Sequence, residues 1–492
     1  MNDTNRTPTT PNDGVGERAA AVLDRAGALV ARVRAHVGRL VDDVTRDARA
    51  VAAEAEALYA SLVDGARVAG VAVRGSPRVG RVLAEAAAIA ASYRAVAALG
   101  GEPGDALHAR CARRAHDLAV ELRGPLLKVG QFAAARADLL PAAWVRELLR
   151  LTDRVPPVAA ATILARIDAE LGPGRFRSVD PEPLAAASLA QVHAAELVDG
   201  TRVAVKVQVP GVEDAVEADL AALRIIAAAF DAGAPALGLP VVAAELARAV
   251  RAELDYAAEA ANAARLASAL AGDADVLVPA VVPELSTARV LTLARVDGRR
   301  LVDYLADAAP AARDHVLATL LRTTAEQIFV HGCFQADPHP GNFLVVPGAD
   351  PDRPRLALLD FGCIATLDAP LRAAYARLAL ALLGGDGAGA AAGLAALGFV
   401  ARDGDPRTVV RLADAMLGAL REGVRLDDPT FDPAAALAQA FALARRHPVA
   451  APSHFVLIGR VLATLGGLVF AHRPAIQPFA AIAPAMSAAL VG

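Results

Sequence analysis

Apolar residues recur every three or four positions along the first part of the chain. Between Gly16 and about Gly75 the series begins with Val22, Ala26 and Leu29, and arginines and aspartates lie between the apolar positions. This spacing places the apolar side chains along one face of an α-helix. We therefore predict packed helices here, with a helix at a membrane surface as the alternative, because arginines interleave the apolar positions.

The period of the pattern changes further along. A Gly/Pro-rich break at residues 99–105 precedes more helical sequence, which ends near Arg150. Val203, Val205 and Val207 then alternate with Ala204, Lys206 and Gln208, which predicts a β-strand, and helices dominate again from Leu301. The predicted parts are a disordered leader (1–15), an N-terminal helical region (16–100), a helical extension (101–175), a small lobe with strands (176–297) and a larger helical lobe with a helical tail (298–492).

Composition narrows the class of protein. The 492 residues are 55% hydrophobic and 4% aromatic, so alanine, leucine and valine supply most of the apolar content and favour helix. The net charge is −4 and there are no runs of like charge, so nothing in the sequence indicates a nucleic-acid partner. Cys111, Cys333 and Cys363 lie far apart and are odd in number, which is typical of a reducing compartment and not of a disulfide framework or a zinc site.

Three apolar stretches approach the length of a membrane span, which needs about 18 uncharged residues. Residues 225–244 contain Asp231 and two prolines, residues 453–471 contain Arg460, and the tail from Pro474 contains three prolines. None predicts a transmembrane helix. We expect a cytoplasmic protein, and peripheral contact with a membrane surface stays open as an alternative.

The residues that indicate chemistry lie between Phe334 and Cys363. Asp337 and Asn342 are five positions apart, and the triplet Asp-Phe-Gly begins at Asp360 after an apolar strand. Phosphoryl transfer needs a carboxylate near the acceptor and oxygen ligands for Mg²⁺. These residues in this order predict such a site. His339, between two prolines, is expected to have a structural role.

A lysine on the predicted strand completes the set. Lys206 would be costly on a half-buried strand unless it met negative charge. Nucleotide phosphates and a helix glutamate supply that charge in kinase-like lobes. We expect Glu253 to be the partner of Lys206, with Glu259 as the second choice.

An alanine-rich segment stands where a phosphate-binding loop belongs, ahead of the lysine strand. Its residues are Ala185, Ala186, Ala187 and Ser188, and alanine gives less backbone freedom than glycine. We interpret it as a stiffer phosphate loop. Lys128 and Gln131 stand in the apolar helix that follows Leu122, and by itself this pattern indicates only a surface lysine whose stem covers apolar neighbours.

Together these motifs resemble the ABC1/ADCK/UbiB family of atypical protein-kinase-like proteins. The resemblance covers residues 122–368 and is carried by KVGQ (128–131), AAASLAQVH (185–193), VAVKVQVPG (203–211), ELDYAAEAAN (253–262), ADPHPGN (336–342) and DFG (360–362). It implies an α+β, two-lobed protein-kinase-like fold with an N-terminal helical (KxGQ) extension, predominantly helical overall. The implied cofactors are ATP and Mg²⁺.

The resemblance also implies roles for individual residues. Lys206 would contact nucleotide phosphates, Asn342 and Asp360 would hold Mg²⁺, and Asp337 would take the catalytic-base position. Lys128 and Gln131 would project into the active site and block protein substrates. The implied activity is that of an ATPase or of a small-molecule or lipid kinase in quinone or isoprenoid-lipid metabolism. Its partners would be a nucleotide and a lipid or quinone-like molecule.

Two departures and two alternatives accompany this interpretation. Gln335 stands where the family usually has histidine, and Thr152 where it has glutamine. One alternative is a small-molecule phosphotransferase of the aminoglycoside/choline kinase type, whose loop is similar to ADPHPGN but which lacks the KxGQ helix. The other is a pseudokinase that binds nucleotide or partners without turnover. The oligomeric state is not indicated by the sequence.

Overall fold

The computed structural model of the chain describes residues 77–98, 100–135, 140–151, 156–231, 239–423 and 449–491, and isolated positions between 53 and 60. The chain separates into two compact units, residues 1–107 and 108–492. The first unit contains helix α2 (Pro77–Ala98), which lies within residues 16–100. The predicted leader and most of the predicted helical pattern before Pro77 lie outside the described residues, as does Thr152.

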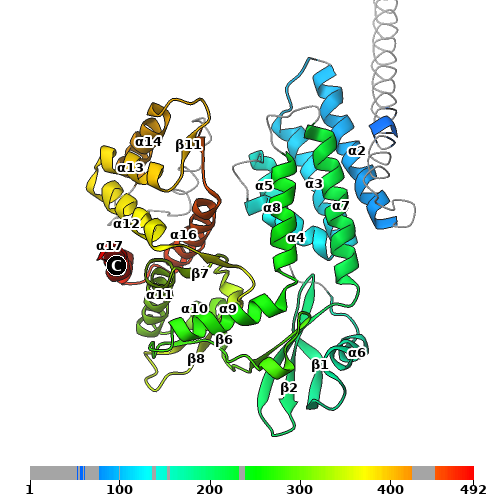
Figure 1. The fold of residues 1–492 in the computed structure, drawn as a ribbon, viewed down its shortest axis with the longest axis vertical. Helices are drawn as coiled ribbons and strands as arrows, with labels where there is room; N and C mark the ends of the chain where they lie inside the picture. The colour runs from blue at the N-terminus through cyan, green and yellow to red at the C-terminus, as the bar shows by residue number, and fades with distance from the viewer. Residues whose placement is uncertain are drawn as a thin grey trace, which may run out of the picture. The chain divides into compact units, whose positions relative to one another are not determined.

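The second unit begins with the helical extension. Its helices are α3 (Asp105–Leu122), α4 (Pro125–Ala135), α5 (Ala142–Leu148) and α6 (Ala160–Leu171). Helix α4 contacts α5 and also two helices from further along the chain, α7 (Val212–Asp231) and α8 (Leu239–Ala252). Figure 1 shows α4, α7 and α8 side by side. Helices α7 and α8, which lie between Lys206 and Glu259 in the sequence, therefore pack on the extension.

The small lobe is built on a four-stranded antiparallel sheet in the order β1-β2-β3-β5. Its strands are β1 (Phe176–Ala186), β2 (Ala190–Leu197), β3 (Arg202–Gln208) and β5 (Val290–Ala294). Val203, Val205 and Val207 are fully buried and pack with Ile163 and Ile167 of α6. The predicted alternation is confirmed, and it directs Lys206 to the opposite face of the sheet, toward helix α9 (Tyr256–Ala269).

The described part of the large lobe holds three short sheets among helices, the third of them the pair β11 and β12. One has the order β4-β9-β8-β6, and another pairs β7 with β10. The strands are β4 (Val276–Leu277), β6 (Arg299–Arg300), β7 (Cys333–Gln335), β8 (Phe343–Val346), β9 (Arg355–Leu358) and β10 (Ile364–Thr366), and β11 (Val400–Ala401) pairs with β12 (Val449–Ala450). The segment containing Asp337 joins β7 to β8, and Asp-Phe-Gly joins β9 to β10. Phe334, Phe343 and Phe361 anchor both segments in one buried cluster.

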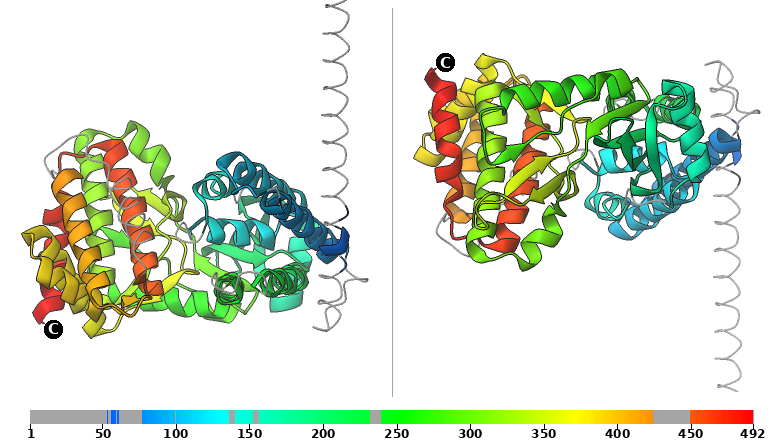
Figure 2. Two further views of the ribbon diagram at one scale, coloured as in Figure 1. Left: turned by 90° about the horizontal axis from the view of Figure 1, so that it is seen from above. Right: turned by 90° about the horizontal axis from the view of Figure 1, so that it is seen from below.

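Helices complete the large lobe. They are α10 (Leu301–Asp307), α11 (Pro310–Ala325), a π-helical turn η4 (Glu326–His331), α12 (Ala369–Gly384), α13 (Gly387–Ala396), α14 (Arg407–Gly423), α16 (Ser453–His472) and α17 (Pro478–Val491), with the 3₁₀ turn η5 (Pro340–Asn342). A further 3₁₀ turn, η3 (Pro283–Leu285), belongs to the small lobe. Figure 2 shows the C-terminal helices α16 and α17, in orange-red and red, within the large lobe, where both contact α11. Among the described residues, α16 is the one helix long and apolar enough to cross a membrane, with a mean hydropathy of 1.8.

Gly332 forms the corner that leads from η4 into β7. Its φ is +63°, and a Cβ atom at this position would lie 2.4 Å from the main-chain oxygen of Leu367. Because a side chain here would be strained and would also clash with backbone, we expect Gly332→Ala to lower the free energy of unfolding by roughly 2–4 kcal/mol. Chemical denaturation measures this loss. Gly404→Ala is the control, since Gly404 has a φ of +71° but open space around it; equal losses in the two variants would contradict the steric argument.

Candidate active site

Lys206 and Glu259 form the central ion pair of the site. The Lys206 ammonium group donates to both carboxylate oxygens of Glu259, at 2.7 and 2.8 Å. The Glu259 side chain is only 2% exposed, and the Lys206 side chain is 25% exposed. A two-point contact in this environment is a strong, charge-assisted interaction.

The expected preference for Glu253 as the partner of Lys206 is wrong. Asp255 caps the N-terminus of α9 by accepting from the amide of Ala258, so the helix begins at Tyr256. Glu253 therefore stands before the helix, whereas Glu259 lies in its first turn on the face toward the sheet. The cap decides which of the two carboxylates reaches Lys206.

The surroundings keep Lys206 charged. Burial by itself lowers the pKa of Lys206, but the carboxylates of Glu259 and Asp360 outweigh burial and raise the pKa above its ordinary value. The ammonium group also lies 4.9 Å from the centre of the Tyr256 ring, a cation–π contact. The influence of Asp360 on Lys206 shows that the lysine and the Asp-Phe-Gly aspartate share one electrostatic environment.

The alanine-rich segment is mostly strand. Ala185 and Ala186 belong to β1 and pair with Val192 and Gln191, so the turn itself spans residues 187–189. The amide of Ala187 donates to Ala190 O at 2.8 Å. The Ser188 hydroxyl is buried and has no hydrogen-bond partner among the described residues. The segment is a tight hairpin, and the stiffness inferred from its alanines stays a prediction.

A buried polar chain supports this hairpin from within. The amide group of Gln191 lies 3.1 Å from His193 Nε2, and His193 Nδ1 lies 2.8 Å from Asp180 O. Because a carbonyl only accepts, Nδ1 is the protonated nitrogen and Nε2 accepts from Gln191. The amide of Val158 donates to Gln191 Oε1, which ties the hairpin to the segment before α6.

The extension reaches the site through Lys128. Its ammonium group lies 3.4 Å from the Glu253 carboxylate, just ahead of α9. Val129 packs against a cluster that includes Leu189 of the alanine-rich turn. The structure does not show Gln131 projecting into the site, because its amide donates to Leu151 O at 3.3 Å within the extension. That carbonyl lies just past the end of α5, where carbonyl groups lack helical partners.

Asp337 and Asn342 lie in the segment between β7 and β8. The Asn342 amide nitrogen donates to Asp337 O at 3.1 Å, which leaves the amide oxygen of Asn342 available to a cation. The Asp337 carboxylate makes no hydrogen bond or ion pair with the described residues. His339 has a local role, since its Nδ1 accepts from the amide of Gly341 at 3.1 Å.

Main-chain contacts fix the Asp-Phe-Gly segment. The Asp360 carboxylate accepts from the amide of Gly362 at 2.9 Å. The side chain of Gln335 donates to Asp360 O at 2.6 Å, and Asn262 of α9 donates to Phe361 O at 3.1 Å. Gln335, the departure noted in the sequence, therefore contacts the backbone of the aspartate itself.

The donor set suits Mg²⁺ bound together with phosphate. Asp360 supplies a carboxylate with one internal hydrogen bond, and Asn342 supplies an amide oxygen, and both are hard oxygen ligands. The described residues contain no group of three or more His, Cys, Asp or Glu side chains that could by itself hold a metal ion. The site fits a cation that takes its remaining ligands from phosphate and water.

Some site contacts had no separate signal in the sequence. Tyr256 and Asn262 belong to the segment ELDYAAEAAN, which was noted only for its glutamates. Arg460 of α16 donates to Ala336 O, and Gln327 of η4 accepts from the amide of Gln335. Arg460 lies 124 residues from Ala336 in the sequence, and the Gln327 contact depends on the turn between η4 and β7, so no local spacing pattern indicates either contact.

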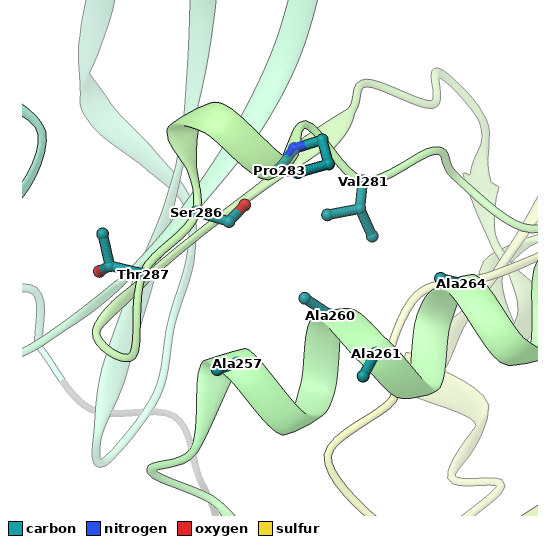
Figure 3. Close-up of a pocket in the computed structure, with 8 residues that line it drawn as sticks. All are labelled: Ala257, Ala260, Ala261, Ala264, Val281, Pro283, Ser286 and Thr287. Atoms are coloured by element: carbon teal, nitrogen blue, oxygen red, sulfur yellow. The ribbon is translucent and has the colours of Figure 1, made fainter.

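Helix α9 also borders an open pocket on its other side. Figure 3 shows this pocket, about 310 Å³ in volume, between α9 and the segment from Val281 to Thr287. Its lining residues are Ala257, Ala260, Ala261, Ala264, Val281, Pro283, Ser286 and Thr287. At 3.6 residues per turn these alanines face away from Glu259. The pocket is separate from the Lys206–Glu259 pair.

The lysine strand, the glutamate helix and the two aspartate segments define a kinase-like protein. The family model of the ABC1 atypical kinase-like domain matches residues 150–393 of this chain. This protein belongs to the ABC1 family of atypical kinase-like proteins.

Curated relatives come from plants, cyanobacteria and animals. The chain is 34% identical over 382 residues to the chloroplastic protein "Activity of BC1 complex kinase 3" of Arabidopsis thaliana, covering 74% of this chain and 52% of that protein. It is 31% identical to the uncharacterized Synechocystis protein sll0095, covering 76% and 67%. It is 34% identical to AarF domain-containing protein kinase 1 of Gallus gallus, covering 63% and 62%. The chain spans about half the length of the plant relative.

A solved structure supports the same fold. The complex of Rv3197 with erythromycin from Mycobacterium tuberculosis is 26% identical, with a TM-score of 0.53, and the match covers 73% of this chain and 92% of that chain. The expected α+β, two-lobed kinase-like fold, predominantly helical, is confirmed.

Proposed function

We propose that this protein binds ATP with Mg²⁺ and releases or transfers the terminal phosphoryl group. The observation that carries the proposal is the gathering of charged groups around Gly362. A Cβ atom at Gly362 would lie 3.3 Å from the Asp360 carboxylate and 3.8 Å from that of Glu259, which in turn holds Lys206. Lys206 and Asp360 are the groups that phosphoryl transfer needs on the phosphates and on their metal ion.

Each residue has a distinct role in this proposal. Lys206, oriented by Glu259, contacts phosphate oxygens, while the alanine-rich turn and Ser188 cover the phosphates. Asn342 and Asp360 hold Mg²⁺, which neutralises charge on the phosphates when bound. The Asp337 carboxylate has no hydrogen-bond or ion-pair partner among the described residues. It accepts the proton of the attacking hydroxyl group or water while the oxygen of that attacking group bonds to the terminal phosphorus and the bond to ADP breaks.

The proposed acceptor is a small molecule or lipid related to quinone or isoprenoid metabolism, or water. Lys128 is bound to Glu253 at the start of α9, so the extension stands beside the nucleotide site and would restrict access by a protein substrate. The proposed location is the cytoplasm, with contact at a membrane surface. The names of the plant relatives place those proteins in the chloroplast.

ATP hydrolysis by the purified chain, measured with Mg²⁺ and with phenolic compounds, vesicles or erythromycin added, tests the proposal. We expect slow hydrolysis that requires Mg²⁺ and rises with a phenolic or lipid additive. Binding of ATP without hydrolysis under every condition would contradict turnover and support a pseudokinase. Rapid phosphorylation of an aminoglycoside or choline would instead favour a small-molecule phosphotransferase of that type.

A further inference from the structure

Arg460 is the only Lys, Arg, Asp or Glu residue in α16. Its guanidinium group donates twice to Ala336 O, from Nε at 2.9 Å and from Nη2 at 2.7 Å. A charged donor is roughly twice as strong as a neutral one. The one charged residue of this apolar helix therefore makes a specific contact with the segment that leads to Asp337.

The same guanidinium group touches the other catalytic segment. Nη2 lies 3.3 Å from Sγ of Cys363, the residue after Asp-Phe-Gly, and the amide of Ala336 donates to Cys363 O at 2.8 Å. Strands β7 and β10 pair here, with Gln335 opposite Ile364. Arg460 thus contacts the point from which the chain runs to Asp337 on one side and back to Asp360 on the other.

The contacts of Arg460 do not involve the carboxylates of Asp337 and Asp360. In the described part of the chain, Arg460 binds a carbonyl and a sulfur atom and no acid. Placing a cation in an apolar helix is costly unless the group is hydrogen-bonded. An apolar residue would pack in α16 without that cost. The arginine is therefore explained by its contacts with Ala336 O and Cys363 Sγ.

We propose that Arg460 is a positioning residue, which holds the backbone at Ala336 and Cys363 so that Asp337 and Asp360 keep their places. The expected effect of Arg460 on ATP turnover rests on the proposed function, whereas its expected effect on the backbone at Ala336 and Cys363 does not. The C-terminal helix α16 is thereby part of the catalytic framework, although it lies beyond residues 150–393 that match the family description.

Kinetics of Arg460→Met and Arg460→Lys test the proposal. Arg460→Met removes the donors while keeping an apolar stem, and we expect kcat to fall about tenfold or more because small displacements of catalytic groups are costly. KM for ATP should change less than about twofold, since Arg460 does not contact Lys206 or Glu259. Arg460→Lys should retain part of kcat, and it carries the comparison if the methionine variant does not fold.

Arg372→Met is the matched control. Arg372 also donates to main-chain carbonyl groups, those of Phe329 and Val330, which belong to η4 and not to either aspartate segment. We expect it to lower stability without lowering kcat. Equal losses of kcat in Arg372→Met and Arg460→Met, or a kcat unchanged in Arg460→Met, would overturn the proposal.

Amide hydrogen exchange gives a readout without turnover. In Arg460→Met the amides of Ala336 and Gly362 should exchange about tenfold faster or more, while those of β3 stay unchanged. If the wild-type protein hydrolyses no ATP but this change occurs, only the proposed function fails. Unchanged exchange at both amides would show that Arg460 does not hold these segments.

Discussion

Asp360→Asn is expected to lower ATP turnover by about a thousandfold or more, because removing a metal-holding carboxylate acts on transition-state charge directly. The substitution keeps the size of the side chain and an oxygen that can accept from the amide of Gly362. Because the Phe361 side chain stays buried and Asn262 still donates to Phe361 O, the fold should persist. Steady-state hydrolysis at saturating ATP and Mg²⁺ measures the loss.

The variant also separates binding from turnover. Lys206 and Glu259 remain, so nucleotide affinity measured without Mg²⁺ should change little, while the enhancement of affinity by Mg²⁺ should be lost. Asp368→Asn is the control, because Asp368 caps α12 and asparagine caps a helix equally well. Turnover in Asp360→Asn within about tenfold of the wild type would remove Asp360 from its proposed metal-binding role.

Local patterns predicted those parts of the fold whose cause is local. The alternation in β3 follows from burial of one strand face against α6, and the two aspartate segments follow from turns between short apolar strands. These features depend on neighbours within a few residues, which a spacing pattern records. The lysine strand and both aspartate segments were therefore predictable.

The choice between Glu253 and Glu259 shows where spacing alone is insufficient. Both residues lie near the N-terminus of the same helix, and which of them reaches Lys206 depends on where that helix begins. Asp255 was a usable signal, since aspartate is a preferred N-cap residue and fixes the helix start at Tyr256. The cap, taken together with helical geometry, would have favoured Glu259.

Gln131 and Arg460 could not be assigned from their neighbours. Gln131 binds a carbonyl 20 residues away, and Arg460 binds one 124 residues away. Both contacts depend on which backbone groups the fold leaves without partners, which becomes known only once the helices are placed. The sequence showed Arg460 as an interruption of an apolar stretch without showing what it binds.

Two lysine–glutamate pairs meet near the N-terminus of α9, and one of them connects the extension with the small lobe. Glu253, just before α9, binds Lys128, and Glu259, in its first turn, binds Lys206. A displacement of α9 would therefore change both contacts together. Helix α9 is the element through which the extension could influence the orientation of Lys206.

Breaking the ion pair between Lys206 and Glu259 is expected to cause the largest change in the free energy of unfolding. Lys206→Met leaves the buried Glu259 carboxylate facing Asp360, and Glu259→Leu leaves the Lys206 cation with one acid fewer. Removal of one partner from a buried pair costs about 3–5 kcal/mol, whereas replacing both partners by apolar groups is often close to neutral. The double variant Lys206→Met/Glu259→Leu should thus be more stable than either single variant in urea denaturation.

The pH dependence identifies which charge is responsible. Burial raises the pKa of Glu259 and Lys206 opposes this rise, so Lys206→Met should raise the pKa further. A carboxyl group with a raised pKa in the folded state binds its proton more tightly there than in the unfolded state. The stability of Lys206→Met should therefore fall, relative to the wild type, as pH rises from about 4.5 through the raised pKa. Glu259→Leu lacks this group and should show no such fall; parallel pH profiles for the two variants would contradict an uncompensated Glu259 carboxylate as the cause.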